Sequence, residues 1–180
     1  MTIPDWHEEP ISKKRDLKAF DCGKDGEALN EFLRRFAYGN HKKGGAKTFL
    51  AIEDASGRVL GYYSLAPTSA SYEQTPESAR KGLPRHPVPG FRLARLATDK
   101  SLQGGGLGTQ LLLAAGKRCI QVADEIGGVA LFLDAKTERA AKWYGDRGAE
   151  RLIGVSKDSP IPMVIPLKTL EAALKEAGQL

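Results

Sequence analysis

Several chemistries are disfavoured by what this 180-residue sequence lacks. Its two cysteines, Cys22 and Cys119, lie far apart, and its three histidines form no zinc pattern, so we expect neither a disulfide framework nor a metal site. The longest apolar runs fall far short of a membrane span, and residues 1–7 carry no basic segment followed by an apolar core. We therefore expect a cytoplasmic protein with no membrane partner and no secretion signal.

Acidic residues are also missing from two stretches of the chain. None lies between Glu31 and Glu53 or between Glu77 and Asp99, and each of these windows holds five basic residues. The net charge is only +5, so the remaining residues are net acidic. Such a polarised charge distribution fits a polyanionic partner on one side of the molecule, although two solvated faces would produce the same pattern.

Length and pattern together predict one domain over residues 1–180 with a sizeable core. Hydrophobic periodicity and turn residues predict the order of elements. The predicted elements are a short strand or extended arm within 1–26, a helix over 27–39, a basic loop over 40–45, strands over 48–53 and 59–66, a proline-rich segment over 67–90 with a short helix at 77–81, a strand over 91–98, a helix over 107–126, a strand over 129–133, a helix over 138–147, strands over 151–155 and 163–167, and a charged helix or tail over 168–180.

This order predicts an α/β fold with a mixed sheet. The first hairpin requires antiparallel neighbours, whereas the strand, helix and strand that follow residue 91 require a parallel crossover. The first helix is predicted to be amphipathic, with its apolar stripe at Leu29, Phe32, Leu33 and Phe36.

The most informative stretch is the glycine-rich segment 103–109, between a predicted strand and the start of the long helix. Glycines let several main-chain amides point into one concavity, and the first N–H groups of a helix add to it, so a diphosphate can bind there without a lysine. The segment has neither the Gly-Lys-Ser/Thr of a Walker A loop nor the Gly-x-Gly-x-x-Gly of a dinucleotide fold. It does fit Gln103-x-x-Gly106-x-Gly108, with a plain glycine turn as the alternative.

That pattern resembles the acetyl-CoA signature of the GNAT N-acetyltransferase superfamily. Further stretches, from about residue 15 to residue 167, resemble one branch of it, the acetyltransferase toxins of bacterial type II toxin-antitoxin modules. These stretches are Ala19-Phe20-Asp21-Cys22-Gly23, Leu29-Asn30-Glu31-Phe32-Leu33, Gly61-Tyr62-Tyr63-Ser64-Leu65, Leu83-Pro84-Arg85-His86-Pro87-Val88-Pro89, Arg95-Leu96-Ala97-Thr98-Asp99 and Ala140-Ala141-Lys142-Trp143-Tyr144.

The resemblance implies a GNAT fold, acetyl-CoA as acetyl donor, acetylation of the α-amino group of aminoacyl-tRNA, and inhibition of translation. It also implies neutralisation by a ribbon-helix-helix antitoxin, and a homodimer. Tyr144 matches the family's catalytic tyrosine, and the main chain of Leu96, Ala97 and Thr98 matches the strand that binds the pantetheine arm and acetyl carbonyl. The residues that match the pyrophosphate loop are Gln103, Gly104, Gly105, Gly106, Leu107, Gly108 and Thr109. The family commonly has Phe-Gly-Phe where this chain has Arg147-Gly148-Ala149, which changes the packing expected under Tyr144.

The chemistry of this reaction suits the residues present. When an amine attacks a thioester, an oxyanion develops and a thiolate leaves. Strand amides near Ala97 and Thr98 could stabilise the oxyanion, and the Tyr144 phenol could protonate the thiolate. An α-amine has a pKa of roughly 8, so a neutral fraction exists without a strong base. Asp99 and Asp134, at predicted strand ends, could assemble a water relay.

The basic windows gain a role under this hypothesis, because a tRNA acceptor stem is bound mainly through its phosphates. The expected RNA-binding residues are Arg34, Arg35, Lys42, Lys43, Arg85, Arg92 and Arg95. Two other readings stay open. One is a GNAT enzyme that acetylates a small-molecule amine or a protein amine, and the other is a module that binds acetyl-CoA or RNA without catalysis. The sequence leaves the preferred tRNA and amino acid undetermined.

Overall fold

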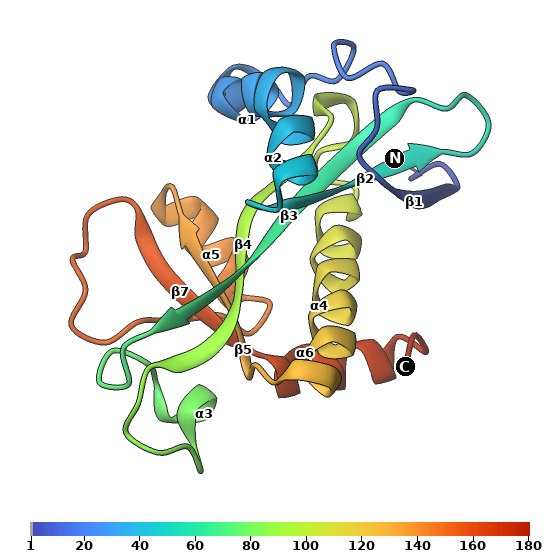
Figure 1. The fold of residues 1–180 in the computed structure, drawn as a ribbon. Helices are drawn as coiled ribbons and strands as arrows, with labels where there is room; N and C mark the ends of the chain where they lie inside the picture. Colours follow the sequence, from blue (N-terminus) through green and yellow to red (C-terminus); the bar gives the residue numbers. More distant parts are fainter. Residues whose placement is uncertain (1) are drawn as a thin grey trace. The chain divides into compact units, whose positions relative to one another are not determined.

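A computed structural model describes residues 2–180 (Figure 1). Its strands form one seven-stranded mixed sheet in the order β1-β2-β3-β4-β5-β7-β6, which confirms the predicted α/β class. The strands are β1 (Trp6–Pro10), β2 (Lys47–Glu53), β3 (Val59–Ala70), β4 (Val88–Thr98), β5 (Ala130–Ala135), β6 (Glu150–Arg151) and β7 (Ile161–Pro166). The helices are η1 (Lys24–Gly26), α1 (Glu27–Glu31), η2 (Phe32–Phe36), α2 (Ala37–Lys43), α3 (Glu77–Arg80), η3 (Lys100–Leu102), α4 (Leu107–Ile126), α5 (Glu138–Gly145) and α6 (Leu167–Glu176).

The described chain divides into two compact units. Unit 1 contains the residues up to Ala66 together with Ala94–Ala114, and unit 2 contains Pro67–Leu93 and Ala115–Leu180. Strands β3 and β4 and helix α4 each continue from one unit into the other. The single domain expected over residues 1–180 stays a prediction. Within residues 2–180, no helix combines the length and apolar character needed to cross a membrane.

Unit 1 contains the predicted hairpin. β2 pairs antiparallel with β3, and β1 adds antiparallel to the outer side of β2, with Trp6 opposite Glu53. The pairing register shifts between Ala51 and Ile52, which is a β-bulge. β3 runs four residues beyond the predicted end, to Ala70. Helix α2 packs against β2 (Figure 1), and the fully buried ring of Tyr62 meets Phe20 edge-on at a centroid distance of 5.7 Å.

The first helix differs from its prediction in two ways. It continues to Lys43 before Gly44 ends it in a left-handed conformation, so Lys42 and Lys43 belong to its last turn and the predicted basic loop is wrong there. Cations are favoured in that turn by the helix dipole, and Gly44 rather than Gly39 supplies the C-terminal signal.

The second difference is a π-helical turn over η2, in which the Ala37 N–H donates to the carbonyl of Phe32, five residues earlier. The wider turn adds one residue to the period, so Ala37, and not Phe36, falls beneath Phe32. Ala37 is completely buried, whereas Phe36 is 51% exposed. The predicted apolar stripe is therefore wrong at Phe36.

Unit 2 contains the parallel pair. β5 pairs parallel with β4 from Gly90 to Arg92 and antiparallel with β7 along its whole length. β6 is shorter than the strand predicted over 151–155, because the Ile153 N–H leaves the sheet to donate to Gln74 O and Gly154 adopts a positive φ of 71°. Helices α5 and α6 both pack against β7.

Two glycines give a paired test of this packing. A Cβ on Gly90 would lie 2.4 Å from the Ala130 carbonyl oxygen, whereas a Cβ on Gly39, an exposed position inside α2, would meet nothing within 4 Å. We expect Gly90→Ala to destabilise the protein by about 1–3 kcal/mol through overpacking. Gly39→Ala should stabilise it by up to about 1 kcal/mol through helix propensity. Denaturant unfolding of both variants measures this, and a Gly90→Ala protein as stable as the parent would contradict the register.

Candidate active site

The glycine-rich segment lies where the sequence places it, between the end of β4 and the start of α4. Gly104 and Gly106 have φ values of 83° and 98°, a left-handed conformation that residues with a side chain rarely adopt. The Gln110 N–H donates to the Gly106 carbonyl at 3.2 Å, which begins the hydrogen-bonded ladder of α4. The N–H groups of the preceding first turn have no acceptor inside the helix, so the segment has the form of an anion-binding nest.

Strand geometry separates the three residues predicted to bind the acetyl arm. The Asp99 N–H donates to Leu60 O at 2.8 Å, and the Ala97 carbonyl oxygen would lie 2.8 Å from a Cβ on Gly61, so both residues face β3. Main-chain groups alternate along a strand, and those of Leu96 and Thr98 therefore point to the opposite edge. The parallel register with β5 ends at Arg92, before this part of β4. Leu96 and Thr98, rather than Ala97, thus present amides on the edge away from β3.

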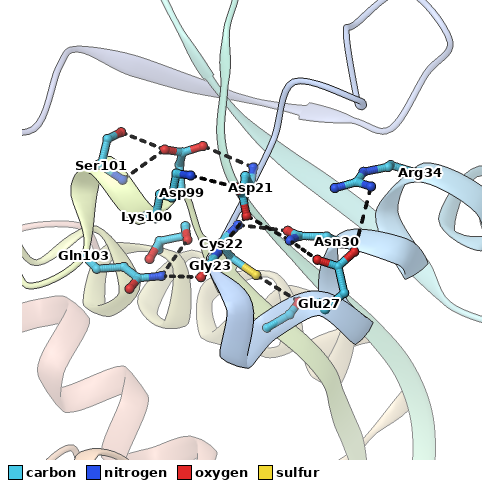
Figure 2. A network of polar contacts seen from close by, with 12 residues as sticks. Asp21, Cys22, Gly23, Glu27, Asn30, Arg34, Asp99, Lys100, Ser101 and Gln103 are labelled. Carbon is cyan, nitrogen blue, oxygen red and sulfur yellow. Dashed lines mark hydrogen bonds and ion pairs between the residues drawn. The ribbon is translucent and has the colours of Figure 1, made fainter.

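The side chain of Gln103 ties the loop to that edge. Its Nε2 donates to Thr98 O at 3.2 Å and to Cys22 O at 2.9 Å (Figure 2). One carbonyl is the last of β4 and the other belongs to the segment before the first helix. The Gln103 side chain therefore fixes the main chain around the loop, which leaves its own main chain to contact a ligand.

The segment that contains Cys22 is held in turn by the first helix. Asn30 is completely buried; its Oδ1 accepts from Cys22 N at 2.8 Å, and its Nδ2 donates to Asp21 Oδ1 at 3.0 Å (Figure 2). Asp21 also pairs with Lys100 at 2.8 Å. Hydrogen bonds from Lys100, the Gly23 N–H and Asn30 lower the Asp21 pKa to about 2, so this carboxylate is ionised at neutral pH.

Both aspartates considered for a water relay have structural partners. Asp99 is 8% exposed, and its carboxylate accepts from the main-chain N and the hydroxyl of Ser101 and from the Asp21 N–H, as the N-cap of η3. Asp134 lies inside β5 and pairs with Arg92. Asp99 thus holds the η3 turn and Asp134 holds Arg92.

Tyr144 belongs to unit 2, near the end of α5, a helix capped by the Thr137 side chain, which accepts from Ala140 N. Burial raises the pKa of its phenol to about 12. The phenol therefore stays protonated across the neutral range and can donate a hydrogen bond. Its ring meets Trp143 edge-on at 5.0 Å.

Residues 147–149, where the resemblance led us to expect Phe-Gly-Phe, support Tyr144. The Arg147 guanidinium stacks 3.8 Å from the Trp143 ring centroid and donates to Trp143 O. The buried Ala149 donates its N–H to Tyr144 O at 3.1 Å. Gly148 has a φ of 98°, and a Cβ there would lie 2.6 Å from Thr169. Cation stacking and main-chain hydrogen bonds thus fix this turn.

The predicted RNA-binding residues fall in both units and differ in their partners. In unit 1, Arg34 and Arg35 pair with Glu27 at 3.9 Å and Glu31 at 3.0 Å, and Arg95 stacks on Phe32. Lys42 and Lys43 are exposed at the end of α2. In unit 2, Arg85 lies over the Tyr72 ring, and Arg92 pairs with Asp134.

Sequence reasoning missed the buried polar network. Asp21 and Asn30 lie in stretches that carried the family resemblance, yet no role followed from them. An asparagine within an apolar helical stripe is the signal that could have pointed to Asn30, because a buried amide needs hydrogen-bond partners.

Comparison with known proteins identifies the family to which this chain belongs. No family model matches the sequence. The tRNA-acetylating toxin of Mycobacterium tuberculosis is 35% identical over 164 residues, which cover 91% of this chain and 93% of the relative. A Tyr-to-Phe variant of KacT has a TM-score of 0.82 at 28% identity, with 93% of this chain and 98% of that chain covered. AtaT in complex with acetyl-methionyl-tRNAfMet has a TM-score of 0.81 at 29% identity, with 94% and 99% covered.

Other matching structures are AtaTR bound with acetyl-CoA, a Tyr-to-Phe variant of AtaT bound to the C-terminus of the antitoxin AtaR, and a KacTA–DNA complex. The sequence relative is similar along almost its whole length, and the solved structures share the fold of this chain. The chain therefore belongs to the family of GNAT-fold acetyltransferase toxins found in toxin-antitoxin modules.

Proposed function

We propose that this protein transfers the acetyl group of acetyl-CoA to the α-amino group of aminoacyl-tRNA and, as the toxin of a toxin-antitoxin pair, thereby inhibits translation. The observation that carries the proposal is the similarity along nine-tenths of the chain to a tRNA-acetylating toxin, together with the fold shared with AtaT bound to acetyl-methionyl-tRNA. Acetylation removes the nucleophilic amine that peptide-bond formation requires.

The donor half of the site consists of the glycine loop and the end of β4. Acetyl-CoA supplies the acetyl group as an activated thioester. The main-chain amides of residues 103–109, apart from Gly105, whose N–H donates to Leu102 O at 3.3 Å, and the N-terminal end of α4 bind its pyrophosphate. The amides of Leu96 and Thr98 point away from β3, so they are the donors for the pantetheine arm and the developing oxyanion.

The acceptor reacts as a neutral amine. As its nitrogen bonds to the carbonyl carbon and the carbon–sulfur bond breaks, the amine releases a proton to solvent and Tyr144 gives its proton to the leaving thiolate. The phenolate of Tyr144 then regains a proton from solvent. A phenol with a pKa of about 12 is always protonated at neutral pH, so it is ready to donate in each cycle. The α-amine pKa of roughly 8 explains why this chemistry needs no strong base.

We further propose partners and a location that follow from this function. The predicted basic residues of unit 1 and those of unit 2 each contact the tRNA. Because charged tRNA is found in the cytoplasm, we expect the protein to be there too. Because AtaT forms a complex with the antitoxin AtaR, we expect this toxin to be neutralised by an antitoxin, of the ribbon-helix-helix type that the resemblance implies. The resemblance also leads us to expect a homodimer.

The direct test uses labelled acetyl-CoA with charged total tRNA, uncharged tRNA and free amino acids as acceptors. We expect label only in the charged tRNA, in the α-amino group. Tyr144→Phe removes one hydroxyl and should lower turnover by about 100-fold or more, because it deletes the proton donor, while acetyl-CoA affinity is retained.

Tyr38→Phe is the matched control, since Tyr38 packs against the core with no hydrogen bond from its hydroxyl within residues 2–180. It should leave turnover unchanged. Acetylation of free amino acids at equal efficiency would favour a small-molecule enzyme. No transfer to any amine, with acetyl-CoA still bound, would favour the binding module.

The loop makes a separate prediction through Gln103. Gln103→Met removes the donor for Thr98 O and Cys22 O, and each neutral hydrogen bond is worth about 0.5–1.5 kcal/mol. If the bound state depends on both bonds, about 1–3 kcal/mol is lost, and calorimetric affinity for acetyl-CoA should weaken by about 5- to 150-fold. Gln121→Met, at an exposed position of α4, should bind as the parent does. Equal affinity in both variants would show that the loop does not depend on this side chain.

A further inference from the structure

Arg95 differs from the other basic residues near the end of β4. Its guanidinium carbon lies 3.6 Å from the centroid of the Phe32 ring, and the residue is half-buried. Within residues 2–180, no hydrogen bond or ion pair to a carboxylate engages it. A guanidinium that is partly removed from water is usually paired, so this charge lacks its expected partner.

Three neighbouring arginines in the basic windows are already engaged. Arg34 and Arg35 pair with glutamates of the same helix, and Arg92 pairs with Asp134. A phosphate would have to compete with those carboxylates. It would meet no such competition at Arg95.

The aromatic side chains beside Arg95, those of Phe32 and Tyr62, carry no charge. Side chains alternate along a strand, so Arg95 shares the face of Ala97, which belongs to the same buried cluster as Phe32 and Tyr62. The Tyr62 hydroxyl donates to Leu29 O at 2.8 Å, and burial raises its pKa, so this phenol stays neutral beside the guanidinium. The charge of Arg95 therefore remains available to a ligand.

The position of Arg95 in the chain connects it to the reaction. It directly precedes Leu96, the first of the residues whose amides face the proposed acetyl site. Stacking on Phe32 orients the planar guanidinium before a ligand arrives, which reduces the entropy lost on binding. A planar fork of donors suits the paired oxygens of a phosphate or a carboxylate.

We propose that Arg95 binds a phosphodiester of the single-stranded 3′ end of the acceptor RNA, the one nearest the aminoacyl ester; this inference rests on the proposed function. In aminoacyl-tRNA the amino acid carboxylate is esterified, so the nearest anion to the reacting amine is that phosphodiester, from which the ester and the terminal ribose separate it. Arg95 is thus a specificity-determining residue that distinguishes an aminoacyl-RNA from a free amino acid or a simple amine.

The test compares acceptors that differ by one phosphate. Puromycin is an aminoacyl nucleoside with a free α-amine and no phosphate, and cytidylyl-puromycin adds a single phosphodiester. We expect Arg95→Met, which keeps an apolar contact with Phe32, to lower kcat/KM by about tenfold or more for charged tRNA and cytidylyl-puromycin, with less than twofold change for puromycin. Arg95→Lys, which retains charge but loses the fork, should fall between the parent and Arg95→Met.

Arg58→Met is the matched control, because Arg58 lies at the turn of the β2–β3 hairpin, outside the proposed site. It should change none of the three values. A second measurement is the salt dependence of charged-tRNA binding. Loss of one phosphate contact should reduce the slope of log K against log salt concentration by about 0.7 to 1 in Arg95→Met.

The results differ according to whether the proposed function fails or only the role of Arg95 fails. If the parent protein acetylates no charged tRNA, the proposed function fails. If the parent does so and Arg95→Met loses the same factor on puromycin as on cytidylyl-puromycin, Arg95 only supports the fold and the inference is overturned. If the parent uses charged tRNA but neither mimic, the salt slope decides, and an unchanged slope overturns the inference.

Discussion

The alternation of main-chain groups along β4 is the constraint on which the candidate site depends. Ala97 and Asp99 face β3, which is possible because Gly61 lets the two strands approach where any side chain would collide with the Ala97 carbonyl. Leu96 and Thr98 must then face the other edge. Parallel pairing with β5 would consume these amides, but its register ends at Arg92. A strand bonded along one edge and unpaired along the other is therefore what allows main-chain amides to serve a substrate.

Such an edge needs support, because main-chain groups at the end of a strand are otherwise free to move. The polar network of Figure 2 provides that support from two sides. Asp99 caps η3, and the Gln103 side chain bonds the last carbonyl of β4. Asn30 reaches from the first helix to fix the Cys22 segment, to which Gln103 also bonds. The first helix and the glycine loop are thus connected through hydrogen bonds. A displacement of either one would therefore move the main chain of Thr98.

The sequence contains enough local information to predict the loop and the order of elements. The glycines at 104 and 106 have the positive φ values that the loop requires, and the apolar run of β5 is buried. The apolar register predicted for α4 is right at Leu107 and Leu111 but wrong near its end, where Val122 and Ile126 are exposed. What could not be predicted depends on contacts between distant residues or on small changes of helical period. The π-turn of η2 exposes Phe36 through one extra residue per turn, which no propensity signals. The two bonds made by Gln103 join residues 5 and 81 positions away, so its side-chain role was invisible in the motif.

The basic windows show how a charge pattern in sequence differs from one in space. Each window was defined by the absence of acids inside it, yet the acids that neutralise its arginines lie outside. Glu27 and Glu31 are one or two helical turns before Arg34 and Arg35, and Asp134 comes from a neighbouring strand to Arg92. Surface pairs of this kind contribute little to stability, so they can exchange a carboxylate for a phosphate at small cost. Arg95 stacks on an aromatic ring and, within the described part of the chain, has no carboxylate to exchange. The basic residues are therefore expected to differ in how strongly they contribute to RNA binding.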